Sequence, residues 1–366
     1  MPAFIHDIVT VNPETSIPQL AIRDMMKSKL AKDRKTEAIL HRIYSQSGIQ
    51  KRHTVIKDFL ASEEDTFFNR ALSNEKRPTT GERNELYKTE STKLFLEIGK
   101  KLLDQNPNIE KSAITHVITV SCTGFFAPGP DFEVVRGLGL APSTQRFHIG
   151  FMGCYAAFPA LKMAQSFCDS NPNATVMVIC AELCTIHFQY KNDTDNLIAS
   201  SVFADGASGA LISAKEPLKT AFRIDQFASS LAYEGERDMA WTIGDTGFNM
   251  ILSSYVPDII ASNLEDVITP LLSKLSITKK EIDLWAVHPG GRAIVDKVEM
   301  SMELSKHQIT ASRKVLSEYG NMSSATILFI LKEILDSYPA KDSKILPMAF
   351  GPGLTIETGL LTVVNS

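Results

Sequence analysis

Short apolar runs that are rich in β-branched residues alternate with helix-like segments along most of this chain. The strand-like runs lie at residues 116–122, 174–181 and 210–213 and, further on, at residues 282–287, 344–350 and 359–364. Helix patterns lie at residues 153–168, 293–304 and 323–337. A short apolar run bounded by turn residues is typical of a buried strand, and strands that alternate with helices are typical of α/β proteins. The sequence therefore predicts an α/β fold with layered sheets.

The alternation is present in both halves of the chain, and in each half a strand that ends in a reactive residue precedes a helix. This repetition predicts two related halves, residues 1–217 and residues 218–366, that meet near the turn-rich segment 214–222. Residues 1–110 are more polar, and we expect them to be mostly helical. Within them, apolar residues recur at three- and four-residue spacing over residues 84–105, which predicts an amphipathic helix.

The composition argues against several classes of protein. The net charge of −4 gives no support for a nucleic-acid partner. No apolar stretch approaches the roughly 20 residues that span a bilayer, so no membrane span is expected. The N-terminus has no basic segment followed by an apolar one, so no signal peptide is expected either. Because five cysteines at irregular spacing also argue against a disulfide framework, we expect a cytoplasmic, soluble protein.

Three residues with catalytic potential each lie at a predicted corner before a helix. Cys154 lies in the segment 150–161 (GFMGCYAAFPAL), His288 follows the strand-like run at 282–287, and Asn321 lies in the segment 318–324 (EYGNMSS). A cysteine with a histidine and an asparagine distant in sequence is a candidate nucleophilic set. Each residue alone also has an ordinary interpretation, as a small buried hydrophobe, a structural imidazole or a helix cap.

Together the three side chains support one kind of chemistry. At the first turn of a helix and near an imidazole, the Cys154 thiol would be stabilised as a thiolate, which attacks thioesters readily. His288 and Asn321 carry N–H donors that can stabilise an oxygen on which negative charge develops. We therefore expect acyl transfer at Cys154, assisted by His288 and Asn321.

The residues around this set resemble those of the type III polyketide synthases, the chalcone-synthase-like branch of the thiolase superfamily. The similarity extends from residues 49–52 (IQKR) to residues 351–355 (GPGLT). Its most specific parts are Gly153-Cys154, His288-Pro289-Gly290-Gly291, Tyr319-Gly320-Asn321-Met322-Ser323-Ser324 and the Gly-Pro-Gly-Leu loop at 351–354. The resemblance implies a thiolase-like, five-layered αβαβα fold and a homodimer.

The resemblance also implies a decarboxylative Claisen cycle. Cys154 would accept an acyl group from a starter acyl-CoA, and His288 with Asn321 would bind the thioester oxygen of malonyl-CoA. Loss of CO2 would leave an enolate that attacks the acyl-Cys154 thioester, and repetition would give a poly-β-keto chain that cyclises. The family needs no metal or bound cofactor, and no pair of His or Cys here has the spacing of zinc ligands.

The same resemblance assigns a substrate pocket, in which this chain departs from the plant enzymes. Phe203 matches one of two gating phenylalanines, whereas Met250 replaces the other with a more adaptable side chain. Bulk at Trp241 should shrink the space for a planar aromatic starter. The remaining pocket positions expected from the resemblance are Thr123, Ala127, Cys184, His187 and Ser323.

Three of these positions predict the length of the starter. Small side chains at Thr123, Ala127 and Cys184 resemble those of bacterial alkylpyrone synthases, where they open a tunnel for a long acyl chain. A structural alternative is that Thr123 and Cys184 merely end their strands. His187 would either bind substrate or be satisfied by backbone groups.

The expected CoA entrance keeps only part of the family's pattern. Arg42 matches one basic residue, but Ile39 and Gln46 occupy two neighbouring positions that are basic in the family. A cation near the nucleotide phosphates favours binding. Ala293 matches a position that touches the pantetheine arm.

The sequence thus predicts a bacterial alkylpyrone or alkylresorcinol synthase-like enzyme that uses a fatty acyl-CoA and malonyl-CoA. Two alternatives stay open at this stage. A ketoacyl-carrier-protein synthase of the same superfamily would perform one condensation with a carrier-protein partner. A catalytically silent thiolase-like binding protein would not be acylated at Cys154.

Overall fold

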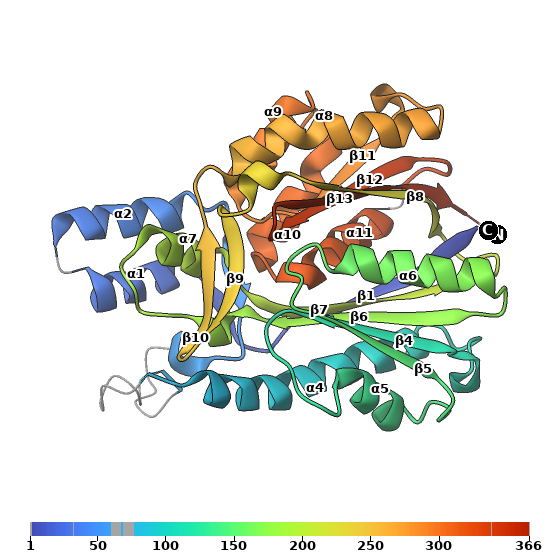
Figure 1. The fold of residues 1–366 in the computed structure, drawn as a ribbon, viewed down its shortest axis with the longest axis horizontal. Helices are drawn as coiled ribbons and strands as arrows, with labels where there is room; N and C mark the ends of the chain where they lie inside the picture. The colour runs from blue at the N-terminus through green and yellow to red at the C-terminus, as the bar shows by residue number, and fades with distance from the viewer. Residues whose placement is uncertain (1, 32, 60–66, 69–76, 338, 366) are drawn as a thin grey trace.

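The computed structural model describes residues 2–31, 33–59, 67–68, 77–337 and 339–365. In this part of the chain, strands β1, β4–β8 and β11–β13 form one continuous nine-stranded sheet. The sheet bends so that its two halves lie in different layers, with helices between them and on both outer sides (Figure 1). The predicted five-layered thiolase-like arrangement is therefore confirmed.

The first half of the sheet has the strand order β5-β4-β6-β7-β1. Strands β4, β5 and β6 are parallel, whereas β7 is antiparallel to both β6 and β1. The bounds of these strands are β1 Ala3–Val11, β4 His116–Ser121, β5 Gln145–Gly150, β6 Thr175–Leu183 and β7 Asp205–Ser213. Because β5 is the last strand on this side, its outer edge has no neighbouring strand in the described chain.

The second half repeats this arrangement. Its order is β11-β12-β13-β8, in which β11 and β12 are parallel and the other two pairs are antiparallel. Thus β11, β12, β13 and β8 correspond to β4, β6, β7 and β1. Their bounds are β8 Ala221–Leu231, β11 Leu284–Val287, β12 Lys344–Gly351 and β13 Thr355–Val364. The halves meet where β1 pairs with β8, and their exact boundary stays a prediction.

Helices form the other three layers. One outer layer contains α4 (Thr80–Asp104) and α5 (Pro130–Leu138), and the opposite one contains α8 (Val256–Lys274) and α9 (Arg292–Ser301). The middle layer contains α6 (Ala157–Ser170) and α11 (Thr326–Asp336) (Figure 1). A helix segment that is apolar on all sides must be buried, and residues 326–331 of α11 are all buried between the two halves of the sheet, whereas its last turn carries charged, less buried side chains.

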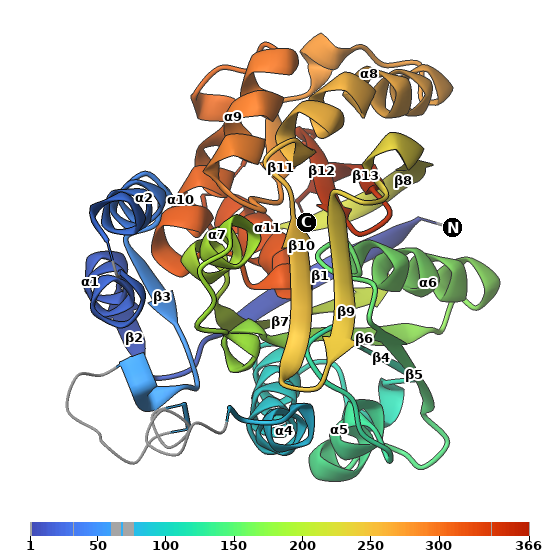
Figure 2. The ribbon, with the colours of Figure 1, turned by 60° about the vertical axis from the view of Figure 1, so that its left-hand side comes forward.

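The remaining elements gather on one side of these layers (Figure 2). They include a hairpin formed by β9 (Met239–Gly244) and β10 (Gly247–Leu252), and a small sheet of β2 (Ser16–Pro18) and β3 (Lys51–His53). The helices of this side are α1 Gln19–Leu30, α2 Arg34–Ser45, α7 Thr194–Val202 and α10 Thr310–Tyr319. Of these segments, α1, β3, α7 and the β9–β10 hairpin contribute lining residues to the cavities described below.

The local predictions agree with the structure only in part. Just over half of the described residues in segment 1–110 belong to α1, α2 and α4, as predicted, but the buried strand β1 at the junction of the two halves was not expected; residues 60–66 and 69–76 lie outside the described chain. The helix expected to open at Cys154 begins at Ala157 instead. The amphipathic helix predicted at 84–105 is confirmed as part of α4.

Candidate active site

The reactive residues of both halves lie where parallel strands end. Cys154 lies between β5 and α6, and His288 directly follows β11. In open α/β sheets, ligands bind beyond the carboxyl ends of such strands, where the chain turns into a helix. The repeated topology therefore brings one reactive corner from each half to the same region.

A tight turn positions Cys154. Phe151 and Gly153 both have positive φ angles, 58° and 86°, and the latter conformation favours glycine. A Cβ atom on Gly153 would lie 2.6 Å from Cδ of Pro352. The loop at 351–354 therefore packs directly against the Cys154 turn, which explains why glycine is needed there.

The imidazole of His288 is buried but has no hydrogen-bonding partner within the described chain. Its backbone N–H donates to the carbonyl of Met348, which continues the ladder between β11 and β12. Neither ring nitrogen has a partner, although the side chain is almost fully buried. Burial lowers the pKa of His288 to about 3. The imidazole is therefore neutral at physiological pH, with both nitrogens available.

Asn321 is fixed by backbone contacts on both sides. Its N–H donates to the carbonyl of Val202, and its own carbonyl accepts from Ala204. The side-chain Oδ1 accepts from the N–H of Ser323, while Nδ2 lies 3.3 Å from the carbonyl oxygen of Gly290. The amide therefore shapes the local turn through its oxygen and presents its N–H group to the cavity.

The three side chains line one narrow cavity, here called the catalytic cavity. Other lining residues are Cys122, Thr123, Gly153, Cys184, Phe203, Met239, Trp241, Met250, Leu252, Gly290, Ile294, Ser323, Phe350 and Pro352. The sulfur of Cys154 lies 3.9 Å from both Oδ1 and Nδ2 of Asn321. Such a cavity offers a sulfur nucleophile, a neutral imidazole and an amide donor to one bound group.

The resting state of Cys154 differs from the expected thiolate. Burial raises the pKa of this thiol to about 11, although hydrogen bonding to Ser323 and Asn321 acts in the opposite direction. Because α6 begins only at Ala157, Cys154 lies outside the helix that was expected to stabilise a negative charge. The thiol is therefore protonated in the resting state, and the neutral imidazole of His288 lines the same cavity.

A buried carboxyl group behind the cavity was not anticipated from the sequence. Glu182, at 0% exposure, accepts hydrogen bonds from the N–H of Cys122 (3.0 Å), from Thr123 Oγ1 (2.8 Å) and from Ser324 Oγ (2.5 Å). Burial raises its pKa, while these hydrogen bonds lower it. The signal in the sequence is a single glutamate inside the apolar run of β6. Glu182 thus fixes Thr123 and the end of β4.

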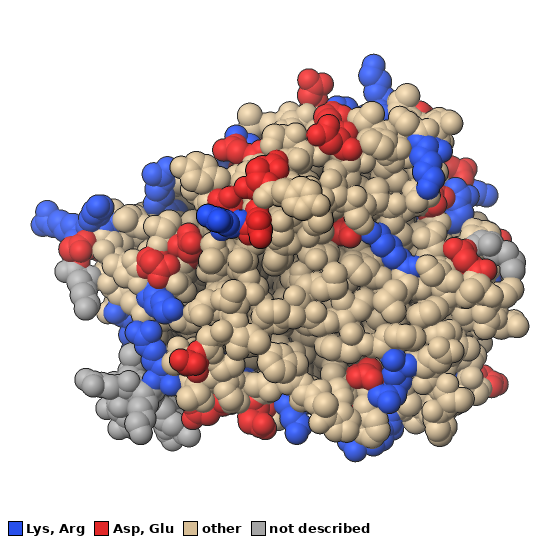
Figure 3. All heavy atoms as spheres, viewed as in Figure 1, with Lys and Arg blue, Asp and Glu red and all other residues tan. Residues whose placement is uncertain are grey.

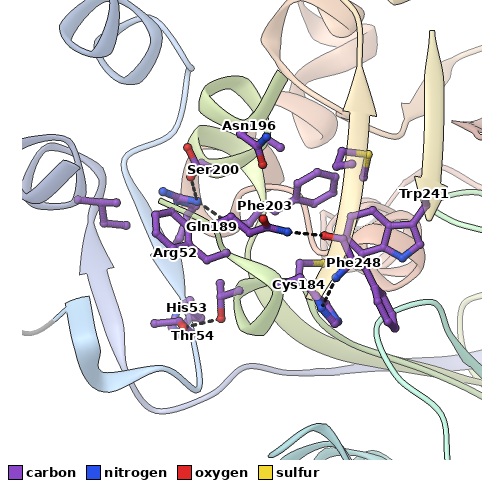
Figure 4. Close-up of a pocket in the computed structure, with 16 residues that line it drawn as sticks. Arg52, His53, Thr54, Cys184, Gln189, Asn196, Ser200, Phe203, Trp241 and Phe248 are labelled. Atoms are coloured by element: carbon purple, nitrogen blue, oxygen red, sulfur yellow. Dashed lines mark hydrogen bonds between the residues drawn. The ribbon is translucent and has the colours of Figure 1, made fainter. Parts of the chain in front are cut away.

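A second cavity, here called the distal chamber, adjoins the catalytic cavity. Both are lined by the four residues Cys184, Phe203, Trp241 and Met250. The distal chamber extends toward α1, β3 and α7, and Figure 4 shows it from one side. The indole Nε1 of Trp241 donates to the carbonyl of Cys122 (2.9 Å), so this ring is held at the boundary.

His187 lines the distal chamber but is satisfied by backbone groups. Its Nε2 donates to the carbonyl of Thr123 (2.7 Å), and its Nδ1 accepts from the N–H of Phe248 (3.1 Å). Burial lowers its pKa to about 3. The ring stacks on Phe248, with 3.9 Å between centroids, and therefore forms part of an aromatic wall.

Three predicted residues lie outside both cavities. Ala127 is exposed and lines neither, so the predicted tunnel wall contains only Thr123 and Cys184 within this chain. Arg42 and Ala293 are exposed, on α2 and α9. The segment after α2 approaches α9, because a Cβ atom on Gly48 would lie 3.5 Å from Cδ of Arg292.

The described residues contain no group of three or more His, Cys, Asp or Glu arranged to hold a metal ion. All five cysteines are free. In the part of the chain that the structure describes, no helix combines the length and apolarity needed to cross a membrane.

The fold and this site define a thiolase-like acyltransferase with a cysteine, a histidine and an asparagine in one cavity. Residues 2–217 match the N-terminal domain of the chalcone and stilbene synthases, and residues 225–365 match their C-terminal domain. The chain therefore belongs to the chalcone and stilbene synthase family, the type III polyketide synthases. Enzymes of this family use acyl-CoA and malonyl-CoA and typically form homodimers.

Two solved structures are similar over the whole chain. One is PKS-I from the brown alga Ectocarpus siliculosus, with 26% sequence identity, a TM-score of 0.91, and coverage of 99% of this chain and 98% of that chain. The other is the C-terminal type III polyketide synthase domain of Steely1, a type I/III hybrid from Dictyostelium, with 27% identity, a TM-score of 0.91, and full coverage of both chains.

Proposed function

We propose that this polyketide synthase condenses a fatty acyl-CoA starter with malonyl-CoA, and that Cys154, His288 and Asn321 are its catalytic residues. The observation that carries this proposal is the single cavity shared by the three side chains, two of which come from the second half of the chain. The products would be alkylpyrones or alkylresorcinols.

In the first step, the sulfur of Cys154 would attack the thioester carbon of the starter. The thiol proton passes to a ring nitrogen of His288, which is neutral and unpaired before the reaction. The bond between the acyl carbon and the CoA sulfur then breaks, and the departing CoA thiolate takes up this proton. The step thus yields acyl-Cys154 and free CoA.

In the second step, malonyl-CoA would bind with its thioester oxygen facing His288 and Nδ2 of Asn321. Cleavage of the bond to the carboxylate releases CO2 and leaves the electron pair as an enolate. Neutral N–H donors placed at this oxygen stabilise the developing charge. The enolate carbon then attacks acyl-Cys154, and the Cys154 thiolate leaves, so that the chain is two carbons longer.

A long aliphatic starter is supported by the two adjoining cavities. The catalytic cavity and the distal chamber share four lining residues, so an acyl chain on Cys154 would extend from the first into the second. Thr123 and Cys184 contribute small side chains, whereas Trp241 occupies space at the boundary. Each methylene buried in such a cavity favours binding by about 0.8 kcal/mol.

The CoA nucleotide would bind outside the catalytic cavity, near the ends of α2 and α9. Arg42 and Ala293 are the positions that family resemblance assigns to this role. We add Arg292, which is 52% exposed and adjoins Gly48 after α2. Its guanidinium could contact phosphate and offset the missing cations at Ile39 and Gln46.

We also propose that the enzyme works as a homodimer in the cytoplasm. The edge of β5, which has no neighbouring strand in the described chain, and the exposed rings of Phe125 and Phe151 favour association with a second copy. The surface shown in Figure 3 carries its charges mainly around the rim, with a broad uncharged area in the middle. Free cysteines are typical of a reducing compartment.

One assay tests this function. The purified protein is incubated with malonyl-CoA and a series of acyl-CoAs from acetyl to hexadecanoyl, in buffer that contains EDTA and no carrier protein or added cofactor. We expect alkylpyrones or alkylresorcinols by mass spectrometry, with decanoyl-CoA or longer starters preferred over acetyl- and coumaroyl-CoA. If a single condensation occurs only in a parallel reaction to which carrier protein has been added, the protein is instead a ketoacyl-carrier-protein synthase. The absence of both products and acyl adducts would identify a silent binding protein.

A further inference from the structure

Gln189 carries an unpaired hydrogen-bond acceptor at the distal chamber. The residue lies between α7 and the short helical turn Cys184–His187, lines the chamber and is 7% exposed. Its Oε1 is buried and has no hydrogen-bonding partner among the residues that the structure describes. Figure 4 shows the side chain crossing the chamber toward Phe248.

The orientation of this amide is determined by its neighbours. Nε2 lies 3.2 Å from the carbonyl oxygen of Phe248 and 3.3 Å from Oδ1 of Asn249. Both atoms are acceptors, so a rotated amide would place oxygen against oxygen. The acceptor Oε1 must therefore face away from the β9–β10 hairpin.

An unpaired buried carbonyl is unfavourable, and a bound group that donates a hydrogen bond would relieve this cost. His288 shows the same pattern at the catalytic cavity. Among buried, unpaired side-chain N and O atoms of the described chain, only those of His288 and Gln189 belong to residues that line these two cavities. The parallel indicates that Gln189, like His288, is prepared for a ligand.

We propose that Gln189 is a specificity-determining residue that selects starter chains bearing a hydroxyl group, whose O–H donates to Oε1. The inference rests on the proposed acyl-CoA-dependent function and adds a chemical class of substrate to it. A hydroxyacyl chain on Cys154 would pass the boundary residues Phe203 and Met250 and place its hydroxyl in the distal chamber.

Other polar groups in the chamber favour a hydroxyl over an amide. The hydroxyl of Thr185 donates to Asp205, and the hydroxyl of Thr54 donates to Thr185. The hydroxyl of Ser200 donates to the carbonyl of Leu197. An amide group in the acyl chain would bring a carbonyl oxygen that needs a hydrogen-bond donor, but the hydroxyl groups of Thr185, Thr54 and Ser200 already donate to other acceptors. A hydroxyl satisfies Gln189 without that requirement.

The first test measures binding without turnover. In the Cys154→Ala background, dissociation constants are determined by calorimetry for decanoyl-CoA and for monohydroxydecanoyl-CoAs whose hydroxyl is moved one carbon at a time along the chain. Because the acceptor Oε1 has a fixed position, only chains whose hydroxyl lies at one or two adjacent carbons should reach it. These chains should bind about tenfold more tightly than decanoyl-CoA does. A flat series, or weaker binding of every hydroxylated chain, would overturn the inference.

The second test assigns any preference to Gln189. Gln189→Leu keeps the approximate size but removes the acceptor, so the preference for the best hydroxylated chain should fall about tenfold. The matched control is Gln226→Leu, because Gln226 lies on β8 and outside both cavities. This variant should keep the preference for the hydroxylated chain. An unchanged preference in folded Gln189→Leu would overturn the proposal.

Turnover separates this proposal from the proposed function. If the enzyme extends alkyl chains but its kcat/KM shows no preference for hydroxylated ones, the selection by Gln189 is wrong and the synthase function stands. If binding is selective but no chain is extended with malonyl-CoA, the synthase function is wrong and the hydroxyl site stands.

Discussion

Nδ2 of Asn321 lies 3.9 Å from the sulfur of Cys154, although 167 positions separate the two residues. The contact joins the two halves of the fold, because Cys154 follows β5 of the first half and Asn321 follows α10 of the second half. A donor this close to the proposed acyl carrier is suited to an oxygen of the second substrate. The geometry therefore connects the repeated topology to condensation chemistry.

The pKa of Cys154 predicts how its reactivity depends on pH. Because burial raises this pKa to about 11, the thiol is protonated below that value and the thiolate fraction should rise about tenfold per pH unit between pH 7 and pH 10. The rate of iodoacetamide alkylation, measured at the Cys154 peptide by mass spectrometry, should rise in the same way. A rate that is constant from pH 6 to pH 8 would indicate a preformed thiolate–imidazolium pair instead.

Asn321→Ala should separate the two steps of the reaction. The substitution removes a donor to the enolate oxygen, which costs about 3 kcal/mol, or roughly a hundredfold or more in rate. Release of CO2 from malonyl-CoA should fall by that factor, while acylation of Cys154 by the starter should remain. The exposed Asn108→Ala variant serves as the control. Loss of acylation with decarboxylation intact would reverse the proposed roles.

Gly320→Ala should destabilise the protein and displace Asn321. Gly320 has φ 73° and ψ −157°, a conformation that essentially only glycine adopts, and a Cβ atom there would lie 2.9 Å from the carbonyl oxygen of Val202. We expect a loss of about 3 kcal/mol in the free energy of unfolding, measured by urea denaturation.

Gly139→Ala is a matched control for this substitution. Gly139 also has a positive φ, 65°, but its Cβ position has no atom within 4 Å. Gly139→Ala should lower the free energy of unfolding by only about 1 kcal/mol and leave the rate of malonyl-CoA decarboxylation unchanged. Equal losses in the two variants would show that the contacts around Gly320 do not matter.

Cys184→Phe should shorten the preferred starter. Cys184 lines both cavities, so a phenyl ring there would block the passage to the distal chamber. Excluding three methylenes from burial would cost about 2.4 kcal/mol, or about fiftyfold in kcat/KM for hexadecanoyl-CoA. Acetyl-CoA use and malonyl-CoA decarboxylation should be retained, and Cys184→Ala should keep the long starters. An unchanged chain-length profile in Cys184→Phe would make Cys184 an ordinary core residue.

The fold could be predicted from the sequence where a local pattern of apolar residues determines the secondary structure. The apolar runs of β4, β6, β11 and β12 have few polar residues, so their burial could be predicted. The strand β1 was missed because His6 and Asp7 interrupt its apolar pattern. Both are buried in the fold, where they pair with Ser213 and with Asn106 and Lys219, respectively. Such partners are distant in sequence, and no local pattern identifies them.

The candidate site, like the fold, could be predicted only in part. Cys154, His288 and Asn321 lie in distinctive short segments, and the fold brings all three to one cavity. The position of Ala127 depends on the path of an exposed loop, and the free oxygen of Gln189 depends on a hairpin about 60 residues away. These features follow from tertiary packing, which residue spacing alone does not reveal.

The most direct test of the account is the intact mass of the protein after brief incubation with decanoyl-CoA alone. The account predicts an increase of one decanoyl group, located on the Cys154 peptide, its absence in Cys154→Ala, and its disappearance from the wild-type protein when malonyl-CoA is added. No adduct in the wild-type protein, or an adduct that persists in Cys154→Ala on Cys122 or Cys184, would contradict the central claim that Cys154 carries the acyl chain.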